Sequence, residues 1–280
     1  MPIRPGVPGV RRRPMADSLY APPPSGVTPP PGGSLLDRLL HALLPAPCLG
    51  CGEPLPAKGT PLGLCTKCRA VLAPLPREAC AVCARPLAAH ALPADYRCGA
   101  CRRRPPAFDR LLALWSYRAP LDAVVQGLKF KRLDYLGGHL AAALATGLED
   151  RLSGFDHLVP VPLHWRRRLT RGYNQAERIA RPLADQLGLP CSLLLFRRRA
   201  TPPQSLLGKS DRLANLRKAF VVPRPERVRG LRILLVDDVA TTGATLDAAA
   251  SVLKKAGAAS VTALVAGRTP LDPVSRDVRE

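Results

Sequence analysis

The chain has 280 residues, enough for about two domains, and 46% of them are hydrophobic, so most of it can fold around a core. No apolar run reaches the roughly 18 residues that a membrane span needs, and the N-terminal arginines are not followed by the apolar segment of a secretory signal. We therefore expect a cytoplasmic protein. Its formal net charge of +21 points to a polyanionic partner, such as nucleic acid or a pyrophosphate-bearing substrate.

The first 33 residues contain ten prolines and five glycines, which predicts a disordered tail. Met15 is the only methionine besides Met1, so translation that starts at Met15 is a second hypothesis. An amphipathic helix is predicted over Ser34–Leu43. The predicted domain boundaries are 1–33 for the tail, 34–107 for a cysteine-rich region and 108–270 for the larger domain.

Eight of the nine cysteines form four C-x-x-C pairs, separated by 13, 11 and 14 residues. A random scatter would give roughly 0.3 such pairs. A two-residue spacer places both thiolates on one side of a tight turn, and two such turns complete a tetrahedral Zn²⁺ site. The cysteines concerned are Cys48, Cys51, Cys65, Cys68, Cys80, Cys83, Cys98 and Cys101.

Two structural zinc sites are therefore predicted. A disulfide framework does not suit a cytosolic protein, and redox pairs do not occur four in a row. Chain order suggests that the first four cysteines bind one ion and the last four bind the other, although an interleaved arrangement stays open. Because four thiolates on one Zn²⁺ carry a formal charge of −2, two sites would lower the net charge from +21 to about +17.

The larger domain has the pattern of an α/β fold with a parallel sheet. We interpret His139 as an ordinary helix-face residue and Cys191 as a small buried apolar group. The predicted strands are Leu112–Ser116, Phe155–Leu163, Leu193–Phe196, Ile233–Val236 and Val261–Ala266. The predicted helices are Leu121–Phe130, Leu136–Leu148, a segment that ends at Leu187, and Ala244–Gly257.

Two basic segments are candidates for contacts with pyrophosphate or another polyanion. The first follows the strand Phe155–Leu163, where open α/β sheets place ligands, and arginine suits bidentate contacts with oxygen. The second is a long Pro-punctuated connection after Leu193–Phe196, of the kind that forms lids and binding loops. A solvated helix face is the competing interpretation of the first segment. The candidates are Arg168, Arg171, Asn174 and Gln175 in the first segment, and Gln204, Lys209, Arg212 and Asn215 in the second.

The segment Arg232–Leu246 has the most informative order: a buried strand, an acidic pair, a loop of Thr and Gly, and a helix. Amides of such a loop at a helix N-terminus bind anions, and Gly243 allows close approach of an oxygen. The carboxylates of Asp237 and Asp238 suit vicinal hydroxyls or a hydrated metal. This combination describes a ribose 5-phosphate site, and the alternative is an ordinary crossover that Asp238 or Thr242 caps.

The letters L-L-V-D-D-V-A-T-T-G-A-T closely resemble the phosphoribosyl pyrophosphate (PRPP) signature of type I phosphoribosyltransferases. The resemblance implies that the acidic pair holds the ribose 2- and 3-hydroxyls and that the following loop wraps the 5-phosphate. Carried over by position, the PRPP-binding residues are Asp237, Asp238, Val239, Ala240, Thr241, Thr242, Gly243, Ala244 and Thr245.

From Leu35 to Arg268, the order of motifs resembles the ComF (competence protein F) family: two zinc knuckle pairs, R-G-Y-N-Q-A-E, P-P-Q-S-L-L-G-K-S-D-R-L-A-N, and the PRPP signature. The resemblance implies a double zinc ribbon packed on a type I phosphoribosyltransferase-like domain. It also implies a role in DNA uptake during natural transformation, with a helicase-like partner and association with the inner face of the membrane through partners.

Two functions compete. As a binding module, the protein would use a PRPP-type site and a basic groove for single-stranded DNA, with Trp165, Tyr173 and Phe196 available for base stacking. As a Mg²⁺-dependent enzyme, it would transfer ribose 5-phosphate from PRPP to an unidentified acceptor, with Asp237 and Asp238 as catalytic residues. We expect the binding role and treat catalysis as the alternative.

Overall fold

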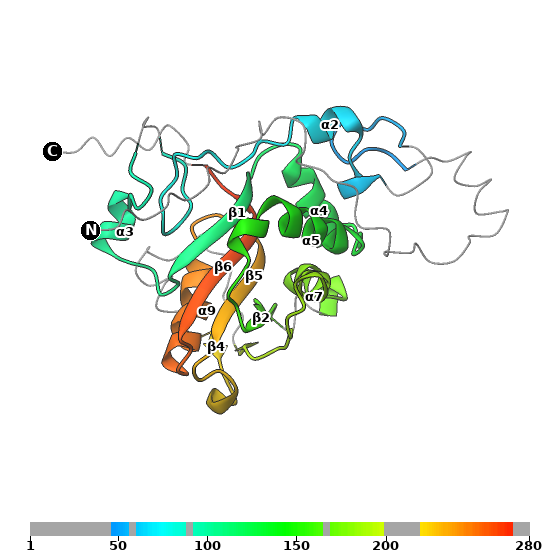
Figure 1. Ribbon diagram of the computed structural model, residues 1–280. Coiled ribbons are helices and arrows are strands. Elements are labelled where there is room, and N and C mark those ends of the chain that lie inside the picture. Colours follow the sequence, from blue (N-terminus) through cyan, green and yellow to red (C-terminus); the bar gives the residue numbers. More distant parts are fainter. Residues whose placement is uncertain (1–45, 56–59, 88–91, 165–168, 199–218, 271–280) are drawn as a thin grey trace, which may run out of the picture.

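A parallel four-stranded sheet forms the centre of the described part of the chain (Figure 1). The computed structural model describes residues 46–55, 60–87, 92–164, 169–198 and 219–270. The spatial order is β1-β6-β5-β2, and every neighbouring pair is parallel. The strands are β1 (Arg110–Ser116), β2 (His157–Pro160), β5 (Arg232–Ala240) and β6 (Ser260–Arg268).

Alternate strand residues build two separate cores, one on each face of the sheet, as the two-residue period of a strand requires. In β5, Ile233 and Leu235 belong to one core, and Leu234 and Val236 belong to the other; all four are 0% exposed. Burial on both faces explains why this strand is a continuous apolar run rather than an alternating one.

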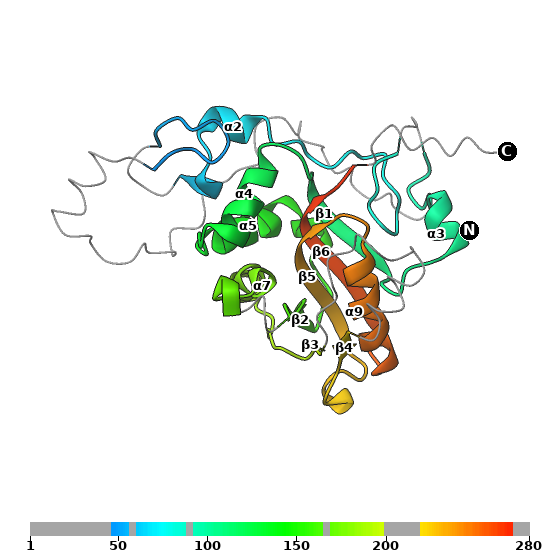
Figure 2. The same ribbon diagram turned by 180° about the vertical axis from the view of Figure 1, so that it is seen from behind.

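Helices cover the two faces unequally (Figures 1 and 2). Three helices contribute their apolar sides to the core that contains Leu234 and Val236, and α9 contributes to the core that contains Ile233 and Leu235. Because β2 leads to α7 on one face and its neighbour β5 leads to α9 on the other, the loops at their carboxyl ends diverge, which is where such sheets bind ligands. The helices are α4 (Leu121–Phe130), α5 (Leu136–Gly147), α7 (Gln175–Leu187) and α9 (Ala244–Lys255).

The cysteine-rich region is also divided between the two faces. Cys48 packs in the core of α4, α5 and α7, whereas Cys80, Cys83, Cys98 and Cys101 pack in the core of α9. Figure 1 shows the corresponding short helices, α2 beside α4 and α5, and α3 on the far side of β1. The remaining short elements are η1 (Pro61–Gly63), α2 (Thr66–Ala70), α3 (Gly99–Arg103), η2 (Glu149–Arg151), β3 (Phe196–Arg197), β4 (Phe220–Val221) and η3 (Pro225–Arg227).

The predicted fold class is confirmed, and the helix Leu121–Phe130 has the predicted bounds. One strand prediction is wrong. The run Leu193–Phe196 does not join the parallel sheet: β3 pairs antiparallel with β4, and the nearby Cys191 makes an isolated bridge to the sheet at Leu158. Leu194 and Leu195 are nevertheless buried, so their apolar character reflects packing rather than strand pairing.

The predicted tail and the helix Ser34–Leu43 lie outside the described residues. Within the described ranges, no helix combines the length and the apolar character that crossing a membrane would require.

Candidate functional site

The two adjacent aspartates near the end of β5 serve opposite faces of the sheet, because consecutive side chains of a strand alternate. Asp237 lines a small cavity of about 30 Å³, and Asp238 is buried towards α4. Every residue predicted to hold ribose phosphate lines this cavity, except Asp238. Its lining is Asp237, Val239, Ala240, Thr241, Thr242, Gly243, Ala244, Thr245 and Leu246.

The carboxyl group of Asp237 titrates near neutrality. Burial and the neighbouring charge of Asp238 raise its pKa to about 7, although Lys129 and the amide of Asp238 act in the opposite direction. That amide donates to Asp237 Oδ1 at 2.9 Å. A small change in this environment, such as a bound hydroxyl or cation, therefore decides whether Asp237 is charged.

Asp238 forms an ion pair with Lys129, whose Nζ lies 2.9 Å from Asp238 Oδ1. The aspartate side chain is 8% exposed and the lysine side chain is 25% exposed, so the pair lies at the border between core and solvent. The sequence analysis gave Lys129 no role. No sequence motif marks Lys129, because it reaches Asp238 only through the packing of α4 on the sheet.

The loop after β5 has the backbone of an anion site. Gly243 has φ = +80° and immediately precedes α9, a conformation that favours glycine. Thr242 Oγ1 accepts a hydrogen bond from the amide of Ala244 at 3.2 Å, and both Thr241 and Thr242 are exposed. Thr242 therefore stabilises the turn before the helix, but the N-cap residue is Gly243, so neither Thr242 nor Asp238 caps α9 as the alternative interpretation expected. The following amides and the N-terminus of this twelve-residue helix lie beside the cavity.

Of the residues predicted to contact pyrophosphate, the structure describes Arg171, Asn174 and Gln175. Asn174 caps α7: its Oδ1 accepts from the amide of Ala176 at 3.2 Å, and its Nδ2 donates to Val161 O at 3.0 Å. Gln175 is 3% exposed in the first turn of α7. The arrangement of Asn174 shows a positioning role for that side chain. The other predicted contacts Arg168, Gln204, Lys209 and Arg212 lie outside the described residues.

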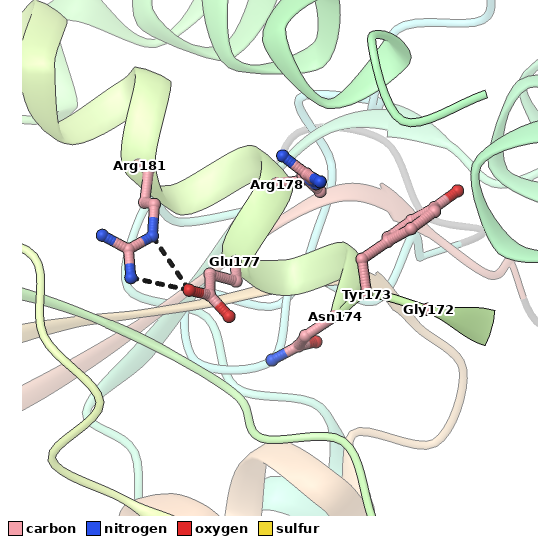
Figure 3. Close-up of a pocket in the computed structure, with 6 residues that line it drawn as sticks. All are labelled: Gly172, Tyr173, Asn174, Glu177, Arg178 and Arg181. Carbon is pink, nitrogen blue, oxygen red and sulfur yellow. Dashed lines mark hydrogen bonds and ion pairs between the residues drawn. The ribbon is translucent and has the colours of Figure 1, made fainter. Parts of the chain in front are cut away.

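A larger cavity of about 200 Å³ lies at the start of α7 (Figure 3). Arg181 donates to Glu177 Oε1 from Nε and Nη2, at 2.9 and 2.7 Å. Arg178 pairs with Asp134 at 3.1 Å. Each guanidinium group already has a carboxylate partner, so an anion here would compete with an acidic side chain. The cavity is lined by Gly172, Tyr173, Asn174, Glu177, Arg178 and Arg181.

Exposed aromatic and basic side chains gather where α4 ends. Phe130 is 69% exposed, and the guanidinium carbon of Arg171 lies 4.8 Å from the centre of its ring. Tyr135 is 51% exposed, and Lys131 and Arg132 lie between the two aromatic residues and are exposed as well. We call these five residues the α4 corner. Since Phe130 directly follows Lys129, the α4 corner adjoins the acidic pair.

The cysteines form two groups of four, in the order of the chain, so the grouping is sequential rather than interleaved. Within each group the ligand atoms lie within 4.8 Å of one another. The sulfur separations Cys51–Cys65 and Cys83–Cys98 are 3.7 and 3.8 Å. Two ligands of a tetrahedral zinc with Zn–S bonds of about 2.3 Å lie about 3.8 Å apart. The thiols therefore fit Zn²⁺.

Backbone amides favour the thiolate form of one cysteine in each group. The amide of Cys65 donates to Cys48 Sγ at 3.2 Å, and the amide of Cys98 donates to Cys80 Sγ at 3.3 Å. Burial raises the pKa of Cys48, but amide donors outweigh it and bring the value to about 6. The same balance lowers the pKa of Cys80 to about 7. We name the groups by position: the first cluster is Cys48, Cys51, Cys65 and Cys68, and the second cluster is Cys80, Cys83, Cys98 and Cys101.

Comparison with known proteins supports both the cysteine-rich region and the α/β domain. A model of the double zinc ribbon domain matches residues 39–103, and a model of the phosphoribosyl transferase domain matches residues 173–276. The DNA utilization protein YhgH of Salmonella typhi is 38% identical over 215 residues, which cover 71% of this chain and 94% of that protein.

Two relatives named for competence match a similar share of the chain. Competence protein F of Haemophilus influenzae is 31% identical over 202 residues, which cover 70% of this chain and 86% of that protein. Competence protein ComFC of Bacillus subtilis is 30% identical over 210 residues, with 71% and 81% covered. With this identity over nearly the full length of its relatives, a double zinc ribbon and a phosphoribosyltransferase domain, the chain belongs to the ComF (competence protein F) family.

Proposed function

We propose that this protein binds a ribose 5-phosphate group, carried by PRPP or a related compound, at the carboxyl end of β5. One observation carries the proposal: a carboxylate that can accept from sugar hydroxyls, Asp237, and the loop amides at the N-terminus of α9 line the same cavity. The 5-phosphate would occupy the loop, and the sugar would extend over Asp237. The ammonium group of Lys129 would face the pyrophosphate side of the ligand.

Magnesium would accompany PRPP, because Mg²⁺ is usually held by one or two carboxylates together with substrate phosphates. Asp237 fits this requirement, since it lines the cavity together with Thr241, Thr242 and Thr245. Bound there, the ion would neutralise charge between pyrophosphate and protein. Asp238 is less available, because Lys129 already occupies it at 2.9 Å.

We also propose that the α4 corner binds single-stranded DNA. Bases of any sequence can stack on aromatic side chains, and cations nearby can hold the phosphates. Phe130 and Tyr135 supply exposed rings, and three cations, Lys131, Arg132 and Arg171, lie within the corner. The net charge of +21 supports a polyanionic partner.

The biological role that fits both sites is the handling of DNA taken up during natural transformation. Support comes from the relatives, which are named for competence and for DNA utilization. We extend that role to this chain and include a helicase-like partner and recruitment to the inner face of the membrane through partners.

Calorimetry with PRPP and Mg²⁺ tests the sugar-phosphate site. The variant Asp237→Asn/Asp238→Asn should lose measurable binding, because amides replace both carboxylates. The control Asp156→Asn changes a carboxylate that pairs with Arg232 at the opposite end of β5, and it should bind as the wild type does. PRPP affinity that survives in the double variant would rule out this site.

Titration with a single-stranded oligonucleotide tests the α4 corner. Phe130→Ala and Arg171→Ala should each weaken binding, whereas Phe196→Ala, an equally aromatic change in β3, should not, because β3 lies apart from α4 (Figure 2). With three cations engaged, the logarithm of the affinity should fall with the logarithm of salt concentration at a slope of about −2. An affinity insensitive to salt, or equal losses in the three variants, would contradict the proposal. Equal loss of PRPP and DNA in the Asp237→Asn/Asp238→Asn variant would show that the two ligands share one site.

Phosphoribosyl transfer is the second candidate, and the Lys129–Asp238 pair favours it, since an ammonium group beside the site can stabilise a leaving pyrophosphate. Pyrophosphate release from PRPP, followed with candidate bases and amines, tests catalysis. Pyrophosphate release that depends on an acceptor and disappears in Lys129→Met would establish that the protein is an enzyme. PRPP binding without pyrophosphate release would support the binding role alone.

A further inference from the structure

Arg268, the last residue of β6, is a buried arginine that joins the second cluster to the sugar-phosphate loop. It is 1% exposed. Its Nε donates to the carbonyl of Cys83 at 3.0 Å, and its Nη1 donates to the carbonyl of Ala240 at 2.8 Å and to that of Thr241. One planar guanidinium group thus contacts a cysteine of the cluster and the two residues where the loop begins.

The position of Arg268 follows from the sheet register. Arg268 is the parallel partner of Ala240, so β6 ends beside the start of the loop. The amide of Thr269 donates to Ala240 O at 3.0 Å, which adds a third hydrogen bond to the same turn. Hydrogen bonds from the end of β6 therefore hold one side of the loop, and the other, exposed side of the loop faces the cavity.

A second link connects the same two regions. The amide of Ala107, six residues after Cys101, donates to Asp247 Oδ1 at 2.6 Å in the first turn of α9. The ring of Phe108 lies 3.9 Å from the place where a Cβ on Gly243 would be. The chain leaving the second cluster thus supports the loop and the helix start, independently of Arg268.

The positive charge of Arg268 is complementary to the negative charge that the second cluster carries when it holds zinc. Within the described part of the chain, the hydrogen-bond partners of the Arg268 guanidinium are carbonyl groups and none is a carboxylate. Four thiolates around Zn²⁺ carry a formal charge of −2, and Cys83 is one of the four. A buried charge is tolerated when an opposite charge and hydrogen bonds compensate it. Zinc in the second cluster would both fix the Cys83 carbonyl and supply that opposite charge.

We propose that Arg268 is a positioning residue through which the second cluster, loaded with zinc, holds the 240–245 loop in its ligand-binding conformation. The first cluster has no such role, because it packs in the core on the opposite face of the sheet. The proposal rests on the proposed ribose-phosphate site for its ligand, but not for the contact itself. Because coupling is reciprocal, a phosphate ligand in the loop must also strengthen zinc binding in the second cluster alone.

Hydrogen–deuterium exchange of residues 240–246 without ligand tests the contact. Arg268→Met and Arg268→Lys should keep two zinc ions per chain and speed loop exchange about 5- to 10-fold. Cys98→Ser should have the same effect through loss of the second zinc, whereas Cys51→Ser, in the first cluster, should leave the loop as it is. Unchanged loop exchange in the arginine variants, or equal effects of the two cysteine variants, would overturn the proposal.

Zinc release to a chelator, with freed thiols alkylated and assigned by peptide mass spectrometry, tests the reciprocal effect. Ribose 5-phosphate should slow release from Cys80, Cys83, Cys98 and Cys101 about 5- to 10-fold and should not affect the first cluster. Arg268→Met should abolish this difference. If ribose 5-phosphate leaves both clusters unaffected in a protein that binds it, the coupling is refuted. If it does not bind at all while Arg268 still controls loop exchange, the proposed function fails and the positioning role stands.

Discussion

Burial and Asp238 raise the pKa of Asp237 to about 7, so this residue changes charge within the physiological range. The carboxylate accepts two sugar hydroxyls better than the neutral acid does, because the ionised form is acceptor-only. We predict that affinity for ribose 5-phosphate rises between pH 6 and pH 8. Calorimetry at several pH values checks this prediction. The control Asp237→Asn should retain only the smaller rise caused by the phosphate, whose second pKa is near 6.

The raised pKa of Asp237 also affects folding stability, which falls as pH rises, whereas ligand affinity increases. Since the folded pKa lies above the unfolded value of 3.8, the contribution of Asp237 to stability is complete below about pH 4 and is lost as pH rises through about 7. Relative to Asp237→Asn, the wild type should therefore become less stable across this window. A parallel pH dependence of unfolding in the two proteins would contradict the assignment.

Lys129 compensates a carboxylate that is 8% exposed. We predict that Lys129→Met lowers the free energy of unfolding by about 1 to 3 kcal/mol, because Asp238 then keeps a buried charge; the exposure of the lysine reduces the penalty. Lys254→Met is the matched control, since Lys254 pairs with a half-exposed Asp109 at the end of another helix. Its cost should be below about 1 kcal/mol. Urea unfolding measures both, and equal costs would contradict the prediction.

At the level of elements, the contact between α5 and α7 depends on one glycine. A Cβ at Gly137 would lie 2.5 Å from Arg178 O, which is backbone and cannot move aside, whereas a Cβ at Gly138 would meet nothing within 4 Å. Both positions are helical, where alanine is favoured by about 1 kcal/mol. We predict that Gly138→Ala stabilises the protein and that Gly137→Ala destabilises it by about 1 to 3 kcal/mol. Thermal unfolding of the two variants should give shifts of opposite sign.

The sequence was sufficient where a local pattern carries the information. The apolar run Ile233–Val236, the Thr/Gly loop and the C-x-x-C pairs each specify their own geometry, and all three lie where predicted. The strand Leu193–Phe196 failed because four apolar residues report burial, not pairing. The division of Asp237 from Asp238 was missed because the strand was expected to end at Val236, whereas β5 continues to Ala240 and keeps its alternation through the acidic pair.

Contacts between distant segments could not be predicted. Lys129 reaches Asp238 only after α4 has folded over the sheet, and Arg268 reaches Cys83 only because β6 lies between β1 and β5. Neither residue belongs to a motif. Both contacts depend on the order of the strands in the sheet, which a single sequence does not reveal.

At the scale of the whole molecule, the two cysteine clusters close opposite faces of one sheet, so each is expected to stabilise the entire domain. We predict that Cys48→Ser, which removes a ligand of the first cluster, lowers Tm by about 10 °C, because structural zinc contributes folding free energy directly. Cys191→Ser, outside both clusters, should change Tm by no more than about 4 °C. Calorimetric scans with metal analysis test this, and full stability of Cys48→Ser with one zinc lost would contradict it.

Both borders of the sheet carry main chain from elsewhere in the protein. Along β1, Leu75 N donates to Leu114 O at 3.0 Å and Leu111 N donates to Val82 O at 2.7 Å; beside β2, Leu158 N donates to Pro190 O at 2.9 Å. An unpaired border is a template on which a foreign strand can assemble, and these bonds occupy the template. Within the described residues, a foreign strand could therefore extend this four-stranded sheet at either border only by displacing these bonds.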